Sequence, residues 1–339
     1  MMPSIDDVAR AAGVSATTVS HVISGRRRVS AERSRAVRAA MARLNYTPSR
    51  AAQSLARGST NILGLMVPDI ANGFFAGLAK GAEAAAREAG FNLLLANTGF
   101  DHRQERTYLE MISSRVVDGV VYAAGLPPKA SELGELLAGL PTVLADESIP
   151  GSRLDTVVSD NADGGRSVAR HLTDLGHSRC LIIDAPSAPA SSEDRVGGFL
   201  SAWRAAGGQW WTQSGDFTYQ SGRDALVAGA AMIQANRISC VFATNDLMAL
   251  GALRELLAMG LRVPKDVSVV GFDDIFDCVL STPELTSVHQ GVDQLGRMAV
   301  ETLIRRISDP WSAPSNAMVP VSLVPRGSSG PARQGNANT

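Results

Sequence analysis

Apolar residues in the first 48 positions recur every three or four residues, which is the spacing of one buried face of an α-helix. The groups that follow this spacing are Val8, Ala9 and Ala12, then Val19, Val22 and Ile23, then Val37, Ala40, Met41 and Leu44. Ser4, Ser15 and Ser30 precede these groups as N-cap candidates, and Asp7 completes a capping-box pattern with Ser4. Gly13 separates the first two groups, so the pattern predicts three short helices with a tight turn, a helix-turn-helix.

Apolar runs and helical patterns alternate from residue 61 onward. The runs are 62–67, 92–96, 119–123, 142–145, 156–158, 180–183, 240–243, 267–272 and 286–288. Helical patterns separate most of them, for instance at 75–89, 163–175, 246–259 and 292–307. Continuous apolar runs between helices are typical of parallel strands that are covered on both faces. About ten such strands exceed one comfortable sheet, so we predict two doubly wound parallel-sheet lobes of the α/β class.

Two further segments complete the predicted organisation. Residues 49–57 have the pattern of a helix of roughly two turns, which is too short to be stable alone and is expected to act as a hinge. The residues after Arg326 are mainly Gly, Ser, Pro, Asn and Gln and are expected to be disordered. The predicted domains are an all-α helix-turn-helix domain (1–48), a hinge helix and linker (49–60), a body (61–326) and a tail (327–339). Within the body we expect an N-lobe of about 61–160 plus 291–320 and a C-lobe of about 161–290 plus 321–326.

Charge is divided unevenly along the chain. In residues 1–60, ten arginines and no lysine stand against three carboxylates, which is a net charge of +7. The whole chain has a net charge of −1, so residues 61–339 carry −8. A small basic unit joined to a larger acidic body indicates a nucleic-acid-binding module attached to a domain with another role.

Composition excludes several other classes of protein. The values of 45% hydrophobic and 19% charged residues are globular and exclude global disorder. No apolar run reaches the ~18 residues of a membrane helix, and the first residues lack the apolar run of a secretory signal. Cys180, Cys240 and Cys278 are widely spaced, which favours buried cysteines in a reducing compartment over a metal or redox site. We therefore expect a cytoplasmic protein with no metal, no cofactor and no membrane contact.

The second predicted helix is the candidate for reading DNA, because that helix of a helix-turn-helix lies in the major groove. Residues expected to face bases or nearby phosphates are Ser15, Ala16, Thr17, Thr18, Ser20 and His21. The arginines expected to contact phosphates are Arg27, Arg28 and Arg35. An alternative interpretation is that Thr17 or Thr18 only caps the helix.

The predicted hinge helix carries its own candidate contacts. Arg50, Gln53 and Arg57 favour a helix that lies on DNA, and Leu55 is a candidate wedge between base steps of the minor groove. The alternative for Leu55 is packing on one face of the hinge.

A set of polar and aromatic residues follows the predicted strands of the body, where open parallel sheets bind ligands. The set comprises Asn72, Phe74, Phe75, Asp146, Arg195, Phe217, Asn245, Asp273 and Gln290. Carboxylates accept hydrogen bonds from hydroxyl groups, arginine donates, and aromatic rings cover C–H surfaces, so the set suits a polyol. Taken singly, these residues are often helix caps, core residues or surface ion pairs, and the set gains its meaning jointly.

Motifs of catalysis are missing from the sequence. It contains no Gly-x-Gly-x-x-Gly after a strand, no Gly-x-x-x-x-Gly-Lys, no His-Glu-x-x-His and no Gly-x-Ser-x-Gly. Residues 160–164 faintly resemble the start of a calcium loop, but Ala162 and His171 occupy two of the ligand positions. His289 ends a strand near the presumed ligand site, where packing is the simpler explanation than general-base chemistry. We therefore do not expect an enzyme.

Several stretches together resemble the lac-repressor (LacI/GalR) family, and they cover nearly the whole chain. They are residues 5–23, 44–55, 64–75, 244–252, 267–274 and 285–290. Within the second helix, Thr17-Thr-Val-Ser-His is most similar to the purine- and ribose-repressor branch, whereas members associated with other sugars more often carry arginine in place of His21. Gly73 replaces the family's usual proline, so the loop that holds Phe74 is expected to be less rigid.

The resemblance implies a periplasmic-binding-protein-like body and a homodimer on palindromic operator DNA, with paired hinge helices in the minor groove. It also implies that the nine residues of the body set occupy ligand-contact positions of ribose-binding proteins and sugar-responsive repressors. Purine repressors look different at the position of Asn245.

We therefore interpret the chain as a ligand-responsive, sequence-specific transcriptional regulator, a repressor, whose effector is a ribose-like sugar or polyol bound between the lobes. Three alternative interpretations stay open. The first is a regulator of the same architecture whose effector is a purine or another small metabolite. The others are a sugar-binding transport protein and an architectural minor-groove binder. The basic head and the missing signal sequence disfavour the transport protein.

Overall fold

The computed structural model describes residues 3–25, 27–47, 59–123, 125, 129–137, 139–185 and 189–333. The chain divides into two compact units. The first consists of Met1–Ile62 with Arg115–Asp118, and the second of Leu63–Ser114 with Gly119–Thr339. No helix in the described part of the chain combines the length and apolar composition needed to cross a bilayer.

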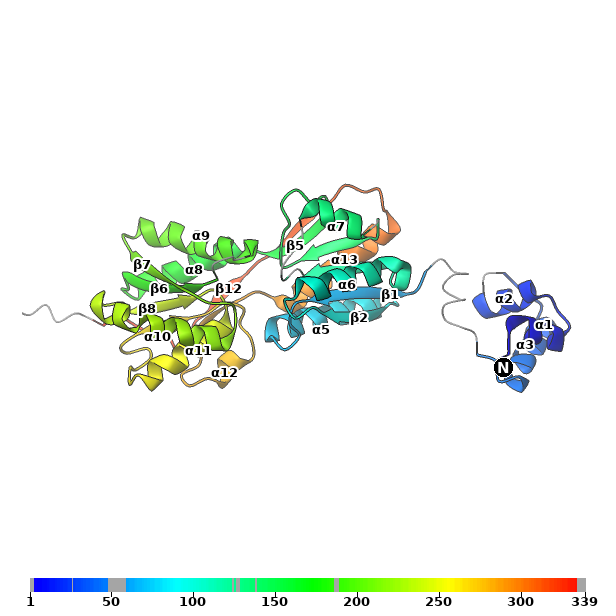
Figure 1. Ribbon diagram of the computed structural model, residues 1–339, viewed down its shortest axis with the longest axis horizontal. Helices are drawn as coiled ribbons and strands as arrows, with labels where there is room; N and C mark the ends of the chain where they lie inside the picture. The colour runs from blue at the N-terminus through cyan, green and yellow to red at the C-terminus, as the bar shows by residue number, and fades with distance from the viewer. Residues whose placement is uncertain are drawn as a thin grey trace, which may run out of the picture. The chain divides into compact units, whose positions relative to one another are not determined.

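The N-terminal head contains three helices, α1 (Ile5–Ala12), α2 (Ala16–Ser24) and α3 (Ala31–Arg43) (Figure 1). The side chain of Ser4 accepts the backbone N–H of Asp7 while Asp7 accepts the N–H of Ser4, so the predicted capping box is confirmed. Gly13 ends α1 with φ 64°, a left-handed conformation that glycine adopts without steric cost. A small core holds the helices together, made of Val8, Ala9, Val19, Val37 and Ala40.

The first lobe of the body is built on a six-stranded sheet in the order β11-β5-β4-β3-β1-β2. Its strands are β1 (Ile62–Val67), β2 (Asn92–Asn97), β3 (Gly119–Ala123), β4 (Thr142–Ala145), β5 (Asp155–Ser159) and β11 (Asn316–Val319). Its helices are α5 (Gly73–Glu88), α6 (His102–Met111), α7 (Ala130–Leu137) and α13 (Val292–Ser308), and a π-helical segment, Ile112–Val116, extends α6. The pairings β1–β3, β3–β4, β4–β5 and β5–β11 are parallel, as the apolar runs predict.

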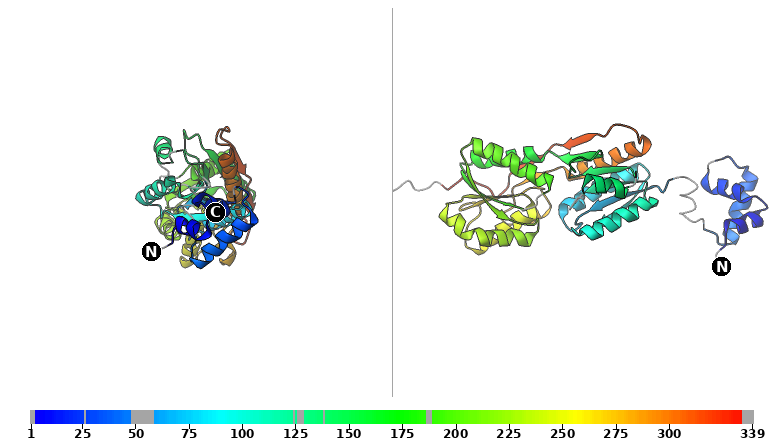
Figure 2. Two further views of the ribbon diagram at one scale, coloured as in Figure 1. Left: turned by 90° about the vertical axis from the view of Figure 1, so that its right-hand side faces the viewer. Right: turned by 45° about the horizontal axis from the view of Figure 1, so that its top comes forward.

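The second lobe has a four-stranded parallel sheet in the order β7-β6-β8-β9. The strands are β6 (Arg179–Asp184), β7 (Gln209–Ser214), β8 (Cys240–Ala243) and β9 (Ser268–Val270), and β10 (Ser287–His289) pairs with β12 (Ser322–Val324) in an antiparallel ladder. The helices are α8 (Asn161–Asp174), α9 (Ala190–Ala205), α10 (Tyr219–Ala235), α11 (Asp246–Ala258) and the short α12 (Asp277–Leu280). Figure 2 shows helices on both sides of each sheet.

Strand residues of the second lobe alternate between two cores, because successive side chains of a strand point to opposite faces. Leu181, Ile183 and Val241 pack in a core with residues of α10 and α11. Cys180 and Phe242 face the other way, into a core with residues of α8 and α9. This burial on both faces explains why the strands read as continuous apolar runs in the sequence.

Three of the described strands are not among the predicted apolar runs: β7, β11 and β12. Each lies at a sheet edge, and their residues are half-buried or exposed at most positions. An edge strand buries less apolar surface, so its sequence lacks a continuous apolar run.

The prediction of a disordered tail from residue 327 is wrong for residues 327–333. Ser328 is fully buried, its backbone N–H donates to Glu284 at 2.9 Å, and its carbonyl accepts the N–H of Val269 at 2.8 Å. The Gly330 carbonyl lies 3.0 Å from Nε2 of His177. Backbone and hydroxyl hydrogen bonds hold this segment on the second lobe, and composition alone does not reveal such bonds.

Candidate functional sites

The polar residues in the N-terminal turn of α2 have different contacts. The hydroxyl of Ser15 accepts the backbone N–H of Thr18 at 3.2 Å and lies 2.9 Å from the hydroxyl of Thr18. Thr18 therefore belongs to the cap, whereas the side chain of Thr17 is exposed. Ala16, Ser20 and His21 are half-buried on the same helix.

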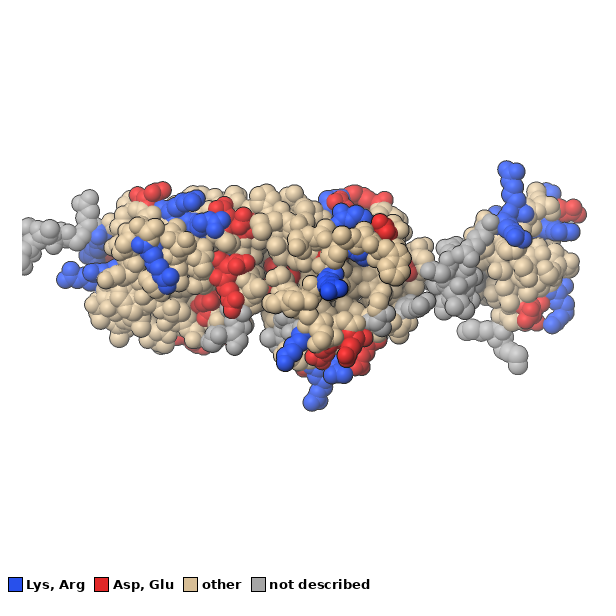
Figure 3. All heavy atoms as spheres, turned by 90° about the horizontal axis from the view of Figure 1, so that it is seen from above, with Lys and Arg blue, Asp and Glu red and all other residues tan. Residues whose placement is uncertain are grey.

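The three predicted phosphate-contacting arginines are all exposed. Arg27 and Arg28 lie in the segment between α2 and α3, and Arg35 lies on α3. Figure 3 shows blue basic side chains projecting from the head. The predicted hinge contacts Arg50, Gln53, Leu55 and Arg57 lie outside the described residues, so their roles stay predictions.

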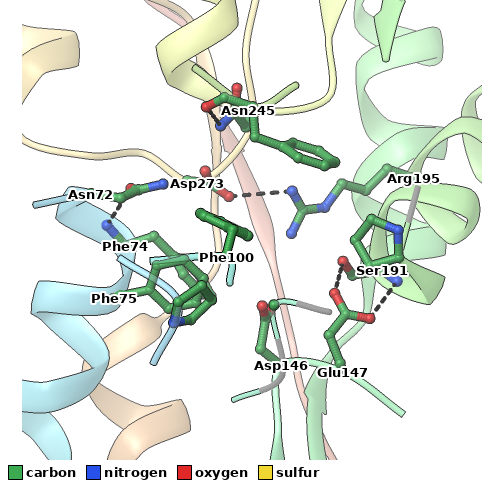
Figure 4. A pocket seen from close by; sticks show the side chains of 14 residues that line it. Asn72, Phe74, Phe75, Phe100, Asp146, Glu147, Ser191, Arg195, Asn245 and Asp273 are labelled. Carbon is green, nitrogen blue, oxygen red and sulfur yellow. Dashed lines mark hydrogen bonds and ion pairs between the residues drawn. The ribbon is translucent and has the colours of Figure 1, made fainter. Parts of the chain in front are cut away.

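The body contains a pocket that encloses about 510 Å³ of space, part of it open to solvent (Figure 4). This volume lies within the range of about 300–1,000 Å³ that small-molecule sites occupy. Eight predicted ligand residues line it: Asn72, Phe74, Phe75, Asp146, Arg195, Phe217, Asn245 and Asp273. The ninth, Gln290, is fully buried beside it and is absent from the lining, because its amide donates to Oδ1 of Asp273 at 2.6 Å.

The wall from the first lobe begins at the N-terminus of α5. The side chain of Asn72 caps this helix and accepts the N–H of Phe74 at 3.0 Å. The rings of Phe74 and Phe75 pack edge to face, with centroids 5.1 Å apart. A Cβ at Gly73 would meet the side chain of Ile275 at 3.1 Å, so a glycine lets α5 approach the second lobe closely.

The wall from the second lobe is organised around Arg195 on α9. Its guanidinium donates to Asn161 and to the Thr244 carbonyl, each at 2.8 Å, and to Asp273 at 3.4 Å. It also stacks over the ring of Phe272 at 4.2 Å. These contacts hold Arg195 in one orientation, with its charge directed at Asp273 across the pocket (Figure 4).

Helix capping and backbone conformation constrain residues of both walls. Asn245 caps α11 by accepting the N–H of Met248 at 2.9 Å, and its amide donates to the Phe217 carbonyl at 2.9 Å. Asp146, Phe217 and Asp273 all have positive φ, at 69°, 66° and 117°. Residues other than glycine rarely adopt this conformation, and such strain clusters at ligand sites.

Three carboxyl groups give the pocket an unusual protonation state. Burial raises the pKa of Asp146 to about 6, although the charge of Arg195 opposes the shift. Burial, and then the charge of Asp146, raise the pKa of Glu147 to about 8. Burial also raises the pKa of Asp273 well above its ordinary value. Oδ1 of Asp146 is buried and has no hydrogen-bond partner among the described residues, so it can accept one from a ligand.

The sequence interpretation did not include three prominent lining residues, Phe100, Glu147 and Ser191. Phe100 and Glu147 follow the ends of β2 and β4 closely, so the strand-end criterion applied more widely selects both. Ser191 lies in the first turn of α9, and no sequence signal distinguishes it from other helix-start serines.

No group of three His, Cys, Asp or Glu side chains suited to a metal ion occurs among the described residues. The three cysteines are buried and unpaired with one another, as expected for apolar core positions.

Comparison with known protein families matches both parts of the chain. Residues 4–49 match the model of bacterial regulatory proteins of the lacI family. Residues 60–326 match the model of periplasmic binding proteins and the sugar-binding domain of the LacI family.

Curated relatives cover the chain almost completely. The HTH-type transcriptional repressor PurR of Vibrio vulnificus (strain CMCP6) is 35% identical over 314 residues, which are 91% of this chain and 93% of the relative. The ribose operon repressor of Escherichia coli (strain K12) is 34% identical over 331 residues, which are 96% of this chain and 100% of the relative.

Solved structures agree in fold. The transcriptional regulator CelR in complex with cellobiose has a TM-score of 0.73 at 32% identity, covering 96% of this chain and 99% of that chain. A LacI family regulator from Enterococcus faecalis V583 with bound ribose has a TM-score of 0.73 at 30% identity, covering 80% of this chain and 100% of that chain. The lac repressor dimer bound to operator and the anti-inducer ONPF has a TM-score of 0.82 at 27% identity, covering 97% of this chain and 100% of that chain.

These matches span the head and the body together, and they confirm the predicted fold and the prediction that the chain is a regulator rather than an enzyme. The chain therefore belongs to the LacI family and is a ligand-responsive transcriptional repressor.

Proposed function

We propose that this repressor acts as a cytoplasmic homodimer on a palindromic operator, and that its effector is a small sugar or polyol bound in the pocket between the lobes. The observation that carries the effector assignment is the lining of the pocket. Hydrogen-bond acceptors, amides and one guanidinium alternate there with phenylalanine rings, which is the combination that holds a polyhydroxylated ring.

Several neighbours support this class of effector. Structural neighbours carry ribose, cellobiose and, in a protein from Alkaliphilus metalliredigens, D-xylulofuranose at 29% identity and a TM-score of 0.71. The unpartnered oxygen of Asp146 suits a hydroxyl donor of such a ligand. A pentose or a pentose-like polyol is therefore the first candidate.

The head supplies operator recognition in this proposal. Thr17 and His21 face bases from α2, and Arg27, Arg28 and Arg35 contact phosphates, so binding weakens as salt increases. Residues 49–57 form the helical hinge only on DNA and only when the two subunits hold them close together. Effector binding sets the angle between the lobes and so biases this order–disorder equilibrium.

A purine effector is the second candidate, because PurR proteins are as similar to this chain as the ribose repressor is. The phenylalanine rings of the pocket also suit a planar base. The two candidates differ in the donors they present, since a purine offers ring N–H groups and a sugar offers hydroxyls to Asp146 and Asp273.

The proposal is tested with the full-length protein and a duplex selected from random sequences. Operator affinity is measured by fluorescence anisotropy with and without D-ribose, D-xylulose, cellobiose, adenine, guanine and hypoxanthine. We expect one sugar to change operator affinity by about 5–150-fold, which corresponds to the usual coupling of ~1–3 kcal/mol. A response to purines alone contradicts the sugar assignment, and a failure to select any palindrome contradicts the operator model.

A further inference from the structure

Glu147 makes a contact between the two lobes at the edge of the pocket. It follows β4 of the first lobe, and its carboxyl group accepts the backbone N–H of Ser191 at 3.1 Å as well as the Ser191 hydroxyl. Ser191 lies in the first turn of α9, a helix of the second lobe. Figure 4 shows the two hydrogen bonds joining Glu147 to this helix.

Through this contact Glu147 caps the N-terminus of α9, which the helix's own N-cap residue does not do. The N-cap residue of α9 is Pro189, whose side chain makes no capping hydrogen bond. A carboxyl group at a helix N-terminus satisfies a free N–H and interacts favourably with the helix dipole. Glu147 is also almost fully buried, so it has little freedom to leave this position.

Glu147 also places a second carboxyl group beside Asp146, in a pocket whose lining contains few positive charges. Among the described lining residues, Arg195 is the single cationic side chain, and its Nε and Nη1 groups already donate to Asn161, Thr244 and Asp273. An anionic ligand group entering at the Asp146–Glu147 side would meet two carboxyl groups, and the one cation of the lining is already paired with the carboxylate of Asp273. A hydroxyl or amine group would instead meet acceptors.

We propose that Glu147 is the specificity-determining residue of this pocket, and that it restricts the effector to uncharged or cationic molecules rich in hydrogen-bond donors. Sugar phosphates and sugar acids are rejected. This inference deepens the proposed function and rests on the pocket being the effector site. The residue acts from a fixed place because α9 holds its carboxyl group.

The test compares neutral and anionic forms of the same sugars on full-length protein. The probes are D-ribose with D-ribose 5-phosphate and D-glucose with D-glucuronate, and the readouts are thermal shift and calorimetry. The proteins are wild type, Glu147→Gln and Glu147→Arg, with Glu135→Gln and Glu135→Arg as matched controls on the exposed side of α7. Gln keeps an oxygen for the Ser191 N–H, so Glu147→Gln removes the acid while it preserves the cap.

We expect wild type and both Glu135 variants to show no stabilisation by the anionic probes. At pH 8.5, where Glu147 is largely ionised, like charges placed together cost several kcal/mol, so Glu147→Gln should bind D-ribose 5-phosphate at least about tenfold more tightly than wild type, and Glu147→Arg more tightly still. In wild type the discrimination should strengthen from pH 6.5 to 8.5 as Glu147 ionises beside Asp146, and in Glu147→Gln this change should be absent.

Two outcomes overturn the inference. One is stabilisation of the wild type by an anionic probe as strong as that by its neutral parent. The other is no gain in anion binding in either Glu147 variant. The proposed function fails separately, when a neutral sugar binds to the wild type and leaves operator affinity unchanged.

Discussion

Single residues define the chemistry of the pocket, and Asp146 is the clearest case. Its positive φ directs a buried carboxylate into the pocket, where Oδ1 has no partner among the described residues. The strained backbone and the unpaired oxygen both cost free energy in the ligand-free protein, and a ligand donor offsets the second cost.

Replacement of Asp146 by Asn tests this role. Because a hydrogen bond to a charged group contributes about 1.5–3 kcal/mol, Asp146→Asn should weaken effector binding by roughly 10–150-fold. Calorimetry with the sugar identified in the operator assay provides the measurement. Asp224→Asn, at an exposed position of α10, is the control and should bind normally. Equal affinity of both variants would show that Asp146 does not contact the ligand.

The raised pKa of Glu147 has a consequence for stability. A carboxyl group with a higher pKa in the folded state holds more protons when folded, so its contribution to stability is lost as pH rises from about 4.5 towards 8. His171 and His177 act in the opposite direction, because burial lowers the pKa of each. The measurement is the free energy of unfolding in urea of wild type and Glu147→Gln, without ligand, at pH 6 and pH 8.5. Wild type should lose more stability over this interval than Glu147→Gln, and parallel curves would contradict the assignment.

At the level of secondary-structure elements, the segment that leads from the hinge into β1 is held by one carboxylate. Asp118 accepts hydrogen bonds from the hydroxyl of Ser59, from the N–H and hydroxyl of Thr60, and from the N–H of Asn61. Burial alone would raise the pKa of Asp118, but these bonds lower it overall. Asp118 lies two residues after the end of the π-helical segment Ile112–Val116.

Removal of this carboxylate should release the segment. In Asp118→Ala the backbone N–H groups of Thr60 and Asn61 lose their acceptor, and their hydrogen exchange should increase by about tenfold, as expected for ~1–2 kcal/mol. Hydrogen-exchange mass spectrometry of the peptide that contains residues 59–61 measures this. Asp118→Asn keeps one acceptor and should show an intermediate rate. Unchanged exchange in Asp118→Ala would mean that other contacts hold the segment.

The recognition helix offers a second prediction at this level. If His21 contacts a base, as proposed, His21→Ala should reduce the preference for the selected palindrome over random duplex by ~1–3 kcal/mol. Arg27→Ala should weaken both duplexes alike and reduce the slope of log affinity against log salt by about 0.9. Anisotropy titrations between 50 and 200 mM salt separate these effects. Loss of preference in Arg27→Ala, with no change in His21→Ala, would reverse the assignment of the two residues.

At the level of the whole molecule, the chain joins a head and a body that each have their own hydrophobic core. Neighbours such as the ribose-bound Enterococcus faecalis regulator align with 80% of this chain and 100% of their own. A variant that lacks residues 1–60 should therefore fold and bind the effector with unchanged affinity. At about 100 times Kd the effector should stabilise it by ~2.7 kcal/mol, a rise in Tm of roughly 5–11 °C. Effector binding that depends on the head would contradict this independence.

The elements of both units follow from the local sequence. Helix starts at Ser4, Ser15 and Ser30 and the buried parallel strands are visible because caps and continuous apolar runs are local signals. The edge strands β7, β11 and β12 and the packed segment 327–333 were not predicted, because sheet position and backbone hydrogen bonds, rather than local apolar runs, hold them in place.

For the candidate site, eight of the nine predicted residues line the pocket, since the ends of parallel strands converge at one edge of a sheet. Gln290 lies beside the pocket rather than in its lining, and only packing shows that its amide donates to Asp273. Glu147 and Ser191 were missed because their significance depends on a contact between residues 44 positions apart. The sequence by itself determined the helices, the buried strands and the class of regulator. Tertiary structure decided which side chains face the ligand and which charges remain unpaired there, because burial and long-range contacts set both.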